Sequence, residues 1–292
     1  MDQLNSSIAE VPKANNPTIV IFGDQSCGKT SVLKRLIRGL PLPIKSTRST
    51  YAPFEIRMIP SEEPLRKISL RYIEDKNHKP TTPREVEFAN ITGLEAEEVE
   101  EKLYEAQRYA QNPSITDVEN TRLPPDSNEL DHTTKNTVCL TISGPHSLFM
   151  IDLPGVVRND ANHENFVLSL VKEYIKKESA ILVPIFHSTS DILTQCAYRL
   201  AREADPSGQR TVGVLTKMDR IVDYPSDDEK HHELATLVKG EGVLVNSAYV
   251  IRNPSDARSE ILEDPEEMEK VTIETLKQHS RELSRHPKSL FD

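Results

Sequence analysis

One short motif constrains this chain more than any other feature: the phosphate-binding pattern G-x-x-x-x-G-K-T, filled here by Gly23-Asp24-Gln25-Ser26-Cys27-Gly28-Lys29-Thr30. Residues 18–22 before it are apolar and mostly β-branched, which predicts a buried strand, and apolar residues at helical spacing follow it up to Gly39. In this context, backbone N–H groups close around phosphate oxygens at the positive end of the helix. We therefore expect Lys29 to reach the β- and γ-phosphates of a nucleotide and the Thr30 hydroxyl to ligate Mg²⁺. The alternative is a chance loop in an unrelated α/β protein.

The charge balance and the cysteines exclude several classes of function. The chain carries 36 Lys and Arg against 46 Asp and Glu, a net charge of −10. Because nucleic acid and anionic membranes attract basic surfaces, we expect no nucleic acid partner. Cys27, Cys139 and Cys196 lie far apart and lack the spacing of a metal or redox site, so they suit a reducing compartment.

The ends and the apolar runs of the chain predict a soluble, cytoplasmic protein. Residues 1–16 are polar and include Pro12, so we expect a flexible arm and not a signal peptide. The longest apolar run, residues 180–186, is too short to span a bilayer.

Strands and helices are expected to alternate along most of the chain. This order predicts a mostly parallel sheet covered by helices on both faces. Residues 52–59 and 68–73, separated by the turn-forming residues 60–64, predict an antiparallel hairpin, and hence an antiparallel edge. The other expected strands are 138–142, 148–151, 180–186, 211–215 and 248–251, and the expected helices are 165–177, 191–204, 229–239 and a charged tail at 266–283.

Residues 74–135 are the least strand-like part of the chain. Thr92 and Glu95 could form a capping box at the start of a helix, with Leu94, Val99, Leu103 and Ala106 as a buried stripe. The acidic outer face of this helix is interpreted as a solvated surface. Residues 112–136 are polar and rich in proline, which predicts a surface loop.

A second motif, Asp152-Leu153-Pro154-Gly155, directly follows a predicted strand. A strand-end aspartate beside a phosphate loop is placed to anchor Mg²⁺, here through a water molecule. Gly155 leaves room for its backbone N–H to approach a γ-phosphate. The alternative is a turn that contacts no ligand.

A third motif, Thr216-Lys217-Met218-Asp219, also follows a buried strand. The Asp219 carboxylate can accept two hydrogen bonds from guanine that adenine cannot offer, and the stem of Lys217 can cover the base. Asn253 is placed to complete the nucleoside pocket, although an ordinary turn residue before Pro254 is nearly as good an interpretation. An ATPase or a nucleotide kinase built on the same loop is the rival that Asp219 disfavours.

Together these residues resemble the GTPase domain of the dynamin superfamily, in particular its fungal and antiviral Mx-like branches. The similarity begins with Gly23–Ser31, which has the Gln-Ser typical of that family's phosphate loop, and covers roughly residues 17–260. It implies a three-layer P-loop GTPase fold, with an insertion at about 74–135 and a helical tail at 261–292. The other matching segments are Leu40-Pro41, Ser46-Thr47-Arg48, Asp152–Gly155, Leu200–Pro206 and Gly213–Asp219.

The resemblance also implies roles for single residues. Gln25 and Ser26 would orient the attacking water and help to neutralise charge between the phosphates, and Thr47 would hold that water and Mg²⁺. The implied ligands are GTP or GDP, Mg²⁺ and a monovalent cation, K⁺ or Na⁺. A transient homodimer of the GTPase domain is implied too, and a membrane or microtubules enter as partners only through the family.

This chain departs from the family pattern in two places. Only residues 42–46 separate Pro41 from Thr47, where relatives carry several more residues. This shorter first switch favours an alternative function, a GTP-binding switch or scaffold module with little hydrolysis. The chain also ends near Asp292, where relatives continue into a stalk and an effector helix, so a domain fragment, a truncated product and a stand-alone form all remain open.

Overall fold

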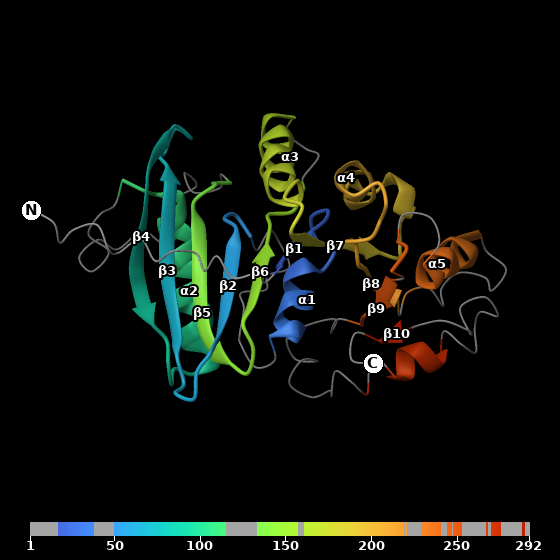
Figure 1. The fold of residues 1–292 in the computed structure, drawn as a ribbon, viewed down its shortest axis with the longest axis horizontal. Helices are drawn as coiled ribbons and strands as arrows, with labels where there is room; N and C mark the ends of the chain where they lie inside the picture. The colour runs from blue at the N-terminus through green and yellow to red at the C-terminus, as the bar shows by residue number, and fades with distance from the viewer. Residues whose placement is uncertain are drawn as a thin grey trace, which may run out of the picture.

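The fold was analysed in a computed structural model, which describes residues 17–37, 50–114, 133–156, 161–218, 220, 229–240, 244–246, 248–252, 267, 270–275 and 288–289. These residues form a ten-stranded sheet in the order β10-β9-β8-β7-β1-β6-β2-β5-β3-β4 (Figure 1). The predicted fold class, a mostly parallel sheet with helices on both faces and an antiparallel edge, is confirmed.

The parallel part of the sheet is centred on β1 (Thr18–Phe22). This strand lies between β6 (Leu148–Asp152) and β7 (Ala180–His187) and runs parallel to both. The order then continues in parallel through three further strands, β8 (Gly213–Thr216), β9 (Ala248–Val250) and β10 (Lys288–Ser289). The carboxyl ends of β1, β6, β7 and β8 therefore meet at one edge of the sheet, where the sequence places its motifs.

The other part of the sheet differs from the predicted hairpin. The strands β2 (Phe54–Pro60) and β3 (Arg66–Glu74) are not neighbours, because β5 (Thr137–Gly144) lies between them. Val138 of β5 is aligned with Phe54 of β2 on one side and with Leu70 of β3 on the other. The hairpin prediction was wrong because the first six residues of β5 are all buried, so this strand takes an interior position that two adjacent partners fill.

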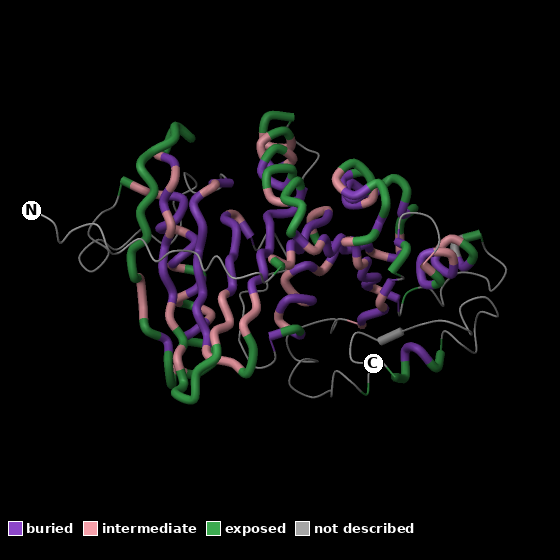
Figure 2. The backbone as a smooth tube through the Cα atoms, in the orientation of Figure 1, coloured by how far each residue is buried: buried purple, intermediate pink, exposed green. Residues whose placement is uncertain are grey.

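The strand β4 (Pro80–Asn90) was not expected at all. It pairs with β3 alone among the described strands and forms the edge of the sheet. Most of its residues are exposed, and Pro80 and Pro83 are typical of an edge strand, which needs no donor on its outer side (Figure 2). Only Val86 and Phe88 alternate with polar residues in β4, and this pattern is too short to predict a strand.

The helix α2 (Ala96–Gln111) begins later than predicted. Its N-cap is Glu95, which forms a capping box with Glu98, whereas the Thr92 hydroxyl donates to the carbonyl oxygen of Arg66 at 3.2 Å. Of the predicted buried stripe, Val99, Leu103 and Ala106 are fully buried, whereas Leu94 lies before the helix and is half-buried.

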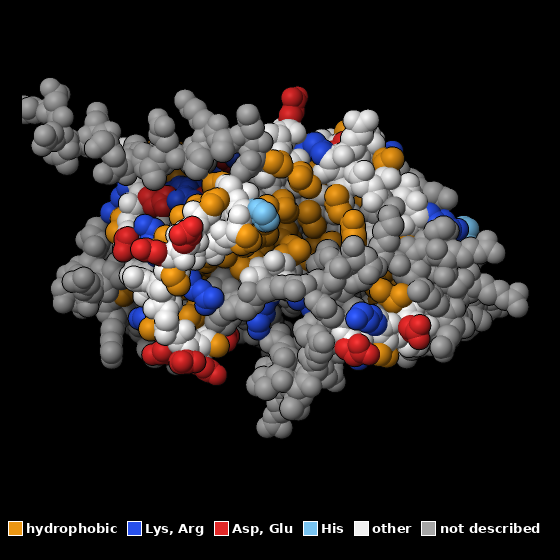
Figure 3. Space-filling view, turned by 60° about the horizontal axis from the view of Figure 1, so that its bottom comes forward, with side chains coloured by type: hydrophobic (Ala, Val, Ile, Leu, Met, Phe, Trp, Pro, Cys, Tyr) orange, Lys and Arg blue, Asp and Glu red, His pale blue; other side chains and the backbone are white. Residues whose placement is uncertain are grey.

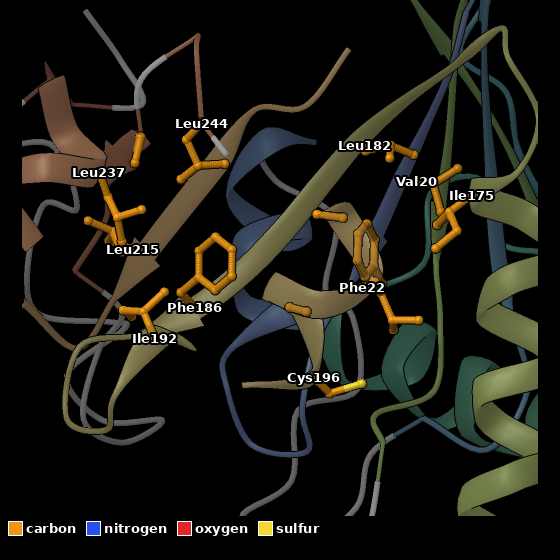
Figure 4. Close-up of a cluster of buried hydrophobic side chains, with 14 of the residues drawn as sticks. Val20, Phe22, Ile175, Leu182, Phe186, Ile192, Cys196, Leu215, Leu237 and Leu244 are labelled. Carbon is orange, nitrogen blue, oxygen red and sulfur yellow. The ribbon is translucent and has the colours of Figure 1, made fainter. Parts of the chain in front are cut away.

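Two apolar clusters fill the spaces between the sheet and its helices. On one face, α1 (Lys29–Leu36) and α2 pack against alternate strand residues such as Ile21. On the other face, residues such as Phe22 pack against three helices, α3 (Ala161–Ile175), α4 (Cys196–Ala204) and α5 (Glu229–Lys239) (Figure 4). The expected helix at 191–204 is split into a short 3-10 turn, Ile192–Thr194, and α4, because Gln195 between them is extended.

The segment before β5 also differs from the prediction. Residues 133–136 belong to the expected surface loop, yet Thr133, Thr134 and Asn136 are buried. The Asn136 amide bonds four backbone groups, namely Ile73 N, Glu74 N, Glu74 O and Ala110 O, at 2.8 to 3.2 Å. This segment is therefore part of the core.

Little of the expected tail helix lies within the described residues. Residues 267 and 270–275 are helical, and Thr272 and Ile273 are buried there. Among the helices that the structure describes, none has the length and apolar character needed to cross a bilayer. Figure 3 shows one face of the molecule, on which hydrophobic side chains gather in the middle and charged side chains lie toward the margins.

Candidate functional site

The predicted phosphate loop joins β1 to α1 in a conformation that needs its particular residues. Gly28 has a φ of 98° and Ser26 a φ of 58°, both in the left-handed region that side chains rarely adopt. A Cβ atom on Gly23 would lie 2.7 Å from the carbonyl oxygen of Ile185, so only glycine fits there. Gln25 is half-buried and Ser26 is exposed, which leaves both side chains within reach of a ligand.

Lys29 is buried inside this loop. Its side-chain nitrogen donates to the carbonyl oxygens of Asp24 at 2.9 Å and Gly23 at 3.3 Å, and the residue is 6% exposed. The ammonium group is thus held in the concave side of the loop by neutral acceptors. An anionic phosphate is a stronger partner for an ammonium than a carbonyl group, so this geometry suits phosphate binding.

Asp152 lies next to the loop, at the end of β6. Its Oδ2 accepts a hydrogen bond from the Thr30 hydroxyl at 3.1 Å. Burial raises the pKa of Asp152 to about 6, and this rise is opposed by the positive charge of Lys29 and by hydrogen bonds from Thr30 and Thr50. The Thr50 hydroxyl also lies 3.3 Å from that of Thr30. Asp152, Thr30 and Thr50 therefore form one small cluster of oxygen atoms beside Lys29.

This cluster fits a divalent cation. Asp152 Oδ1 is buried and has no hydrogen-bond partner among the described residues, although a buried carboxylate oxygen without a partner is costly. Hard cations such as Mg²⁺ take carboxylate and hydroxyl oxygens as ligands and keep further positions for phosphate and water. The described parts of the chain contain no group of three or more His, Cys, Asp or Glu residues that could enclose a metal. A cation at this cluster would therefore need oxygen atoms from a bound molecule to complete its coordination shell.

The turn after Asp152 closes against the phosphate loop. The Gln25 N–H donates to the Val156 carbonyl at 3.1 Å, and Val156 N–H donates to the Gly23 carbonyl at 3.4 Å. A Cβ atom on Gly155 would lie 2.8 Å from both the Gln25 Cα and the Lys29 side-chain nitrogen. Gly155 is thus required for this close approach, which brings the second motif to the first.

The third motif reaches the loop from β8. The buried Thr216 hydroxyl lies 2.7 Å from the carbonyl oxygen of Cys27 and 3.2 Å from that of Phe186. Lys217 has a φ of 58°, an unusual value for a residue with a long side chain. Cys27 itself packs in the core, so its side chain is not available to a ligand. The third motif is therefore tied to the loop through Thr216.

Three of the predicted site residues cannot be placed. Thr47, Asp219 and Asn253 lie outside the described residues, as does the stretch 38–49 that contains Leu40-Pro41 and the shortened first switch. Of the remaining predicted residues, Ser31 lies in α1 and is half-buried.

Two contacts at this site were missed in the sequence. Thr50 takes the position beside Thr30 and Asp152 that was expected of Thr47. The signal was present, because Ser-Thr occurs twice, at 46–47 and again at 49–50. The Asp24 carboxylate accepts a hydrogen bond from Cys196 N at 3.2 Å, so it ties the loop to the start of α4, a contact that no local pattern predicts.

Comparison with known proteins gives a consistent result. The model of the dynamin family matches residues 19–218 of the chain. The interferon-induced GTP-binding protein Mx1 of Equus caballus is 33% identical over 223 residues, which are 73% of this chain and 29% of that protein. The Mx1 protein of Ictalurus punctatus is 32% identical over 234 residues, 77% of this chain and 33% of that protein.

A shorter relative is matched over more of its length. The interferon-induced GTP-binding protein Mx of Perca fluviatilis is 30% identical over 238 residues, which are 77% of this chain and 68% of that protein. The chain thus spans about a third of the first two relatives and about two thirds of this one.

Proposed function

Because the chain belongs to the dynamin family, we propose that it binds GTP with Mg²⁺ and hydrolyses it to GDP and phosphate. The observation that carries this proposal is the cluster of Lys29, Thr30, Thr50 and Asp152 at one edge of the sheet. The relatives are named as GTP-binding proteins, which supports guanine as the base. The family match covers residues 19–218, and we propose residues 17–260 as the GTPase domain, with an insertion at about 74–135.

The residues of the loop divide the work of binding. Lys29 exchanges its carbonyl partners for phosphate oxygens, while the backbone N–H groups from Gly23 to Ser31 surround the phosphates. Thr30, Thr50 and Asp152 hold Mg²⁺, which supplies positive charge against the phosphate oxygens when it is bound. Asp219 and Asn253 recognise guanine, and the stem of Lys217 covers the ring.

Hydrolysis needs an oriented water and compensation of charge. Ser26 is exposed and Gln25 is half-buried, and we assign both to orient the water and to neutralise charge between the β- and γ-phosphates. A monovalent cation would help Ser26 in this task. Thr50 takes the role first assigned to Thr47, because its hydroxyl already contacts the cluster.

The alternative function is a GTP-binding switch or scaffold module with little hydrolysis. It rests on the short segment 42–46 before Thr47. With Thr50 in the proposed role, three further residues separate Pro41 from the functional threonine, which speaks against this alternative. A transient homodimer across the nucleotide face is also proposed from the family, and phosphate release per molecule that rises with protein concentration is its signature.

Titration with a fluorescent GTP analogue tests the binding step. Lys29→Ala removes the charge from the loop and is expected to weaken binding by at least about 100-fold, which is about 3 kcal/mol for a lost charge-assisted contact. Lys34→Ala, at a half-buried position further along the same helix, is the matched control and should bind as the wild type does. Equal affinity of the wild type and Lys29→Ala would count against the proposed function.

A further inference from the structure

We propose that Gln107, in the inserted helix α2, is a positioning residue for hydrolysis. It holds Thr50 beside Thr30 and Asp152 through the backbone of Tyr51. The proposal rests on the proposed function for its effect on hydrolysis, but the contact on which it depends can be measured without turnover.

This contact joins α2 directly to the backbone that follows Thr50. The Tyr51 N–H donates to the Gln107 side-chain oxygen at 3.0 Å, and the Tyr51 carbonyl oxygen accepts from Thr134 N at 3.0 Å. The N–H and the carbonyl group of Tyr51 are thereby held by Gln107 and Thr134, which both belong to the proposed insertion. Thr50 is 5% exposed, and its hydroxyl lies 3.3 Å from that of Thr30, so a shift of the Tyr51 backbone would move this hydroxyl.

The place of Gln107 in α2 supports a specific role. Leu103, Ala106 and Ala110 surround it on the same side of the helix, and all three are fully buried in the apolar cluster. Gln107 itself is 2% exposed. Because burial of a side-chain amide is costly unless its hydrogen bonds are satisfied, a glutamine in an apolar stripe is explained by the bond that it makes.

Thr134, which donates to the Tyr51 carbonyl, is itself held by further hydrogen bonds. The Thr134 hydroxyl donates to Glu74 Oε1 at 2.8 Å, and the same carboxylate oxygen accepts from Lys135 N at 2.7 Å. Asn136 N donates to the Thr134 hydroxyl oxygen at 3.1 Å. The insertion therefore offers a fixed platform for the Tyr51 peptide, and Figure 1 shows α2 packed behind β3 and β5 in this part of the sheet.

Two substitutions of Gln107 separate the hydrogen bond from packing. Gln107→Met keeps the length of the side chain and removes the acceptor, whereas Gln107→Glu keeps an acceptor for the Tyr51 N–H. Leu103→Ala is the matched control, because it creates a cavity in the same helix without changing the acceptor. All variants are made in the full chain and measured below their unfolding temperatures.

The first measurement is hydrogen–deuterium exchange of the Tyr51 amide in the nucleotide-free protein. Loss of the hydrogen bond in Gln107→Met is expected to speed exchange by about 10-fold, while Gln107→Glu and Leu103→Ala stay near the wild type.

The second measurement is GTP hydrolysis. Misplacement of Thr50 is expected to lower kcat by about 10- to 100-fold in Gln107→Met with KM changed less than about 3-fold, and Gln107→Glu should recover most of this loss.

The outcomes distinguish this proposal from the proposed function. Unchanged Tyr51 exchange in Gln107→Met would overturn the positioning contact whatever the activity of the wild type. Faster exchange with unchanged kcat would overturn the catalytic consequence. A wild type that hydrolyses no GTP would contradict the proposed function alone, since amide exchange would still decide whether Gln107 holds Tyr51.

Discussion

At the scale of single residues, the most informative group is the Asp152 carboxylate. It is buried, one of its oxygens lacks a partner among the described residues, and its pKa is raised to about 6 mainly by loss of hydration. A raised pKa means that the folded protein binds a proton more tightly than the unfolded chain does. Between about pH 4 and pH 6 the folded protein therefore loses stability as the pH rises. A cation bound beside Asp152 would therefore stabilise the charged form of this carboxylate.

We therefore expect Asp152→Asn to stabilise the protein in the absence of nucleotide and metal. The neutral amide resembles the protonated acid, so the gain at pH 7.5 is about 3 kcal/mol, from a shift of about 2 pKa units at 1.36 kcal/mol each. At pH 5 the gain should fall to about half. Urea unfolding at both pH values in a chelating buffer measures this gain in stability. A gain that is absent or independent of pH would show that burial does not destabilise the charged carboxylate.

A second prediction concerns Thr50, to which we assign the role first expected of Thr47. Thr50→Ala removes a hydroxyl from the Asp152 cluster and is expected to lower kcat by about 100-fold or more, the usual effect of losing one oriented polar group at a reaction centre. Thr47→Ala is the matched control and should change kcat less than about 3-fold. Steady-state phosphate release decides between them, and the reverse order of the two variants would restore Thr47 to this role.

At the scale of elements, the buried amide of Asn136 connects three of them. It bonds backbone groups at the end of β3 and near the end of α2, and it lies directly before β5. Four backbone groups thus depend on one side chain in a part of the chain that was expected to be a surface loop. The described residues 74–114 and 133–136 are therefore integrated into the fold.

Asn136→Ala should therefore be strongly destabilising. It leaves buried N–H and C=O groups without partners, and the expected cost is about 3 kcal/mol or more in the free energy of unfolding. The matched control is Asn90→Ala at the exposed end of β4, where the loss of one bond to Thr92 N should cost less than about 1 kcal/mol. Chemical denaturation compares the two, and a small effect at Asn136 would mean that water replaces its amide.

The elements that the sequence predicted well are those with strong local signals. The strand at 18–22 and the helix at 229–239 have clear apolar periodicity, and both occur at the predicted positions. The errors concern long-range pairing and a weak pattern. The local sequence does not show that β5 lies between β2 and β3, and the mostly exposed edge strand β4 has only a short apolar alternation. In the site, the motifs located Lys29 and Asp152, whereas Gln107 contributes through a contact across more than 50 positions of the chain that no motif records.

At the scale of the whole molecule, the parallel strands bring distant segments to one edge of the sheet. The loop after β1, the turn after β6 and the end of β8 are joined by the bonds of Gln25 N to Val156 O and of the Thr216 hydroxyl to Cys27 O. The antiparallel part of the sheet, with α2, then holds the backbone next to Thr50. Segments that are far apart in sequence are thus brought together at the candidate site.

The most direct test is the release of inorganic phosphate by the purified chain, with Mg²⁺, from GTP and separately from ATP. The account predicts turnover of GTP, a kcat/KM for ATP that is lower by at least about 100-fold, and loss of GTP turnover in Lys29→Ala. Equal turnover of GTP and ATP, or GTP turnover that survives Lys29→Ala, would contradict it.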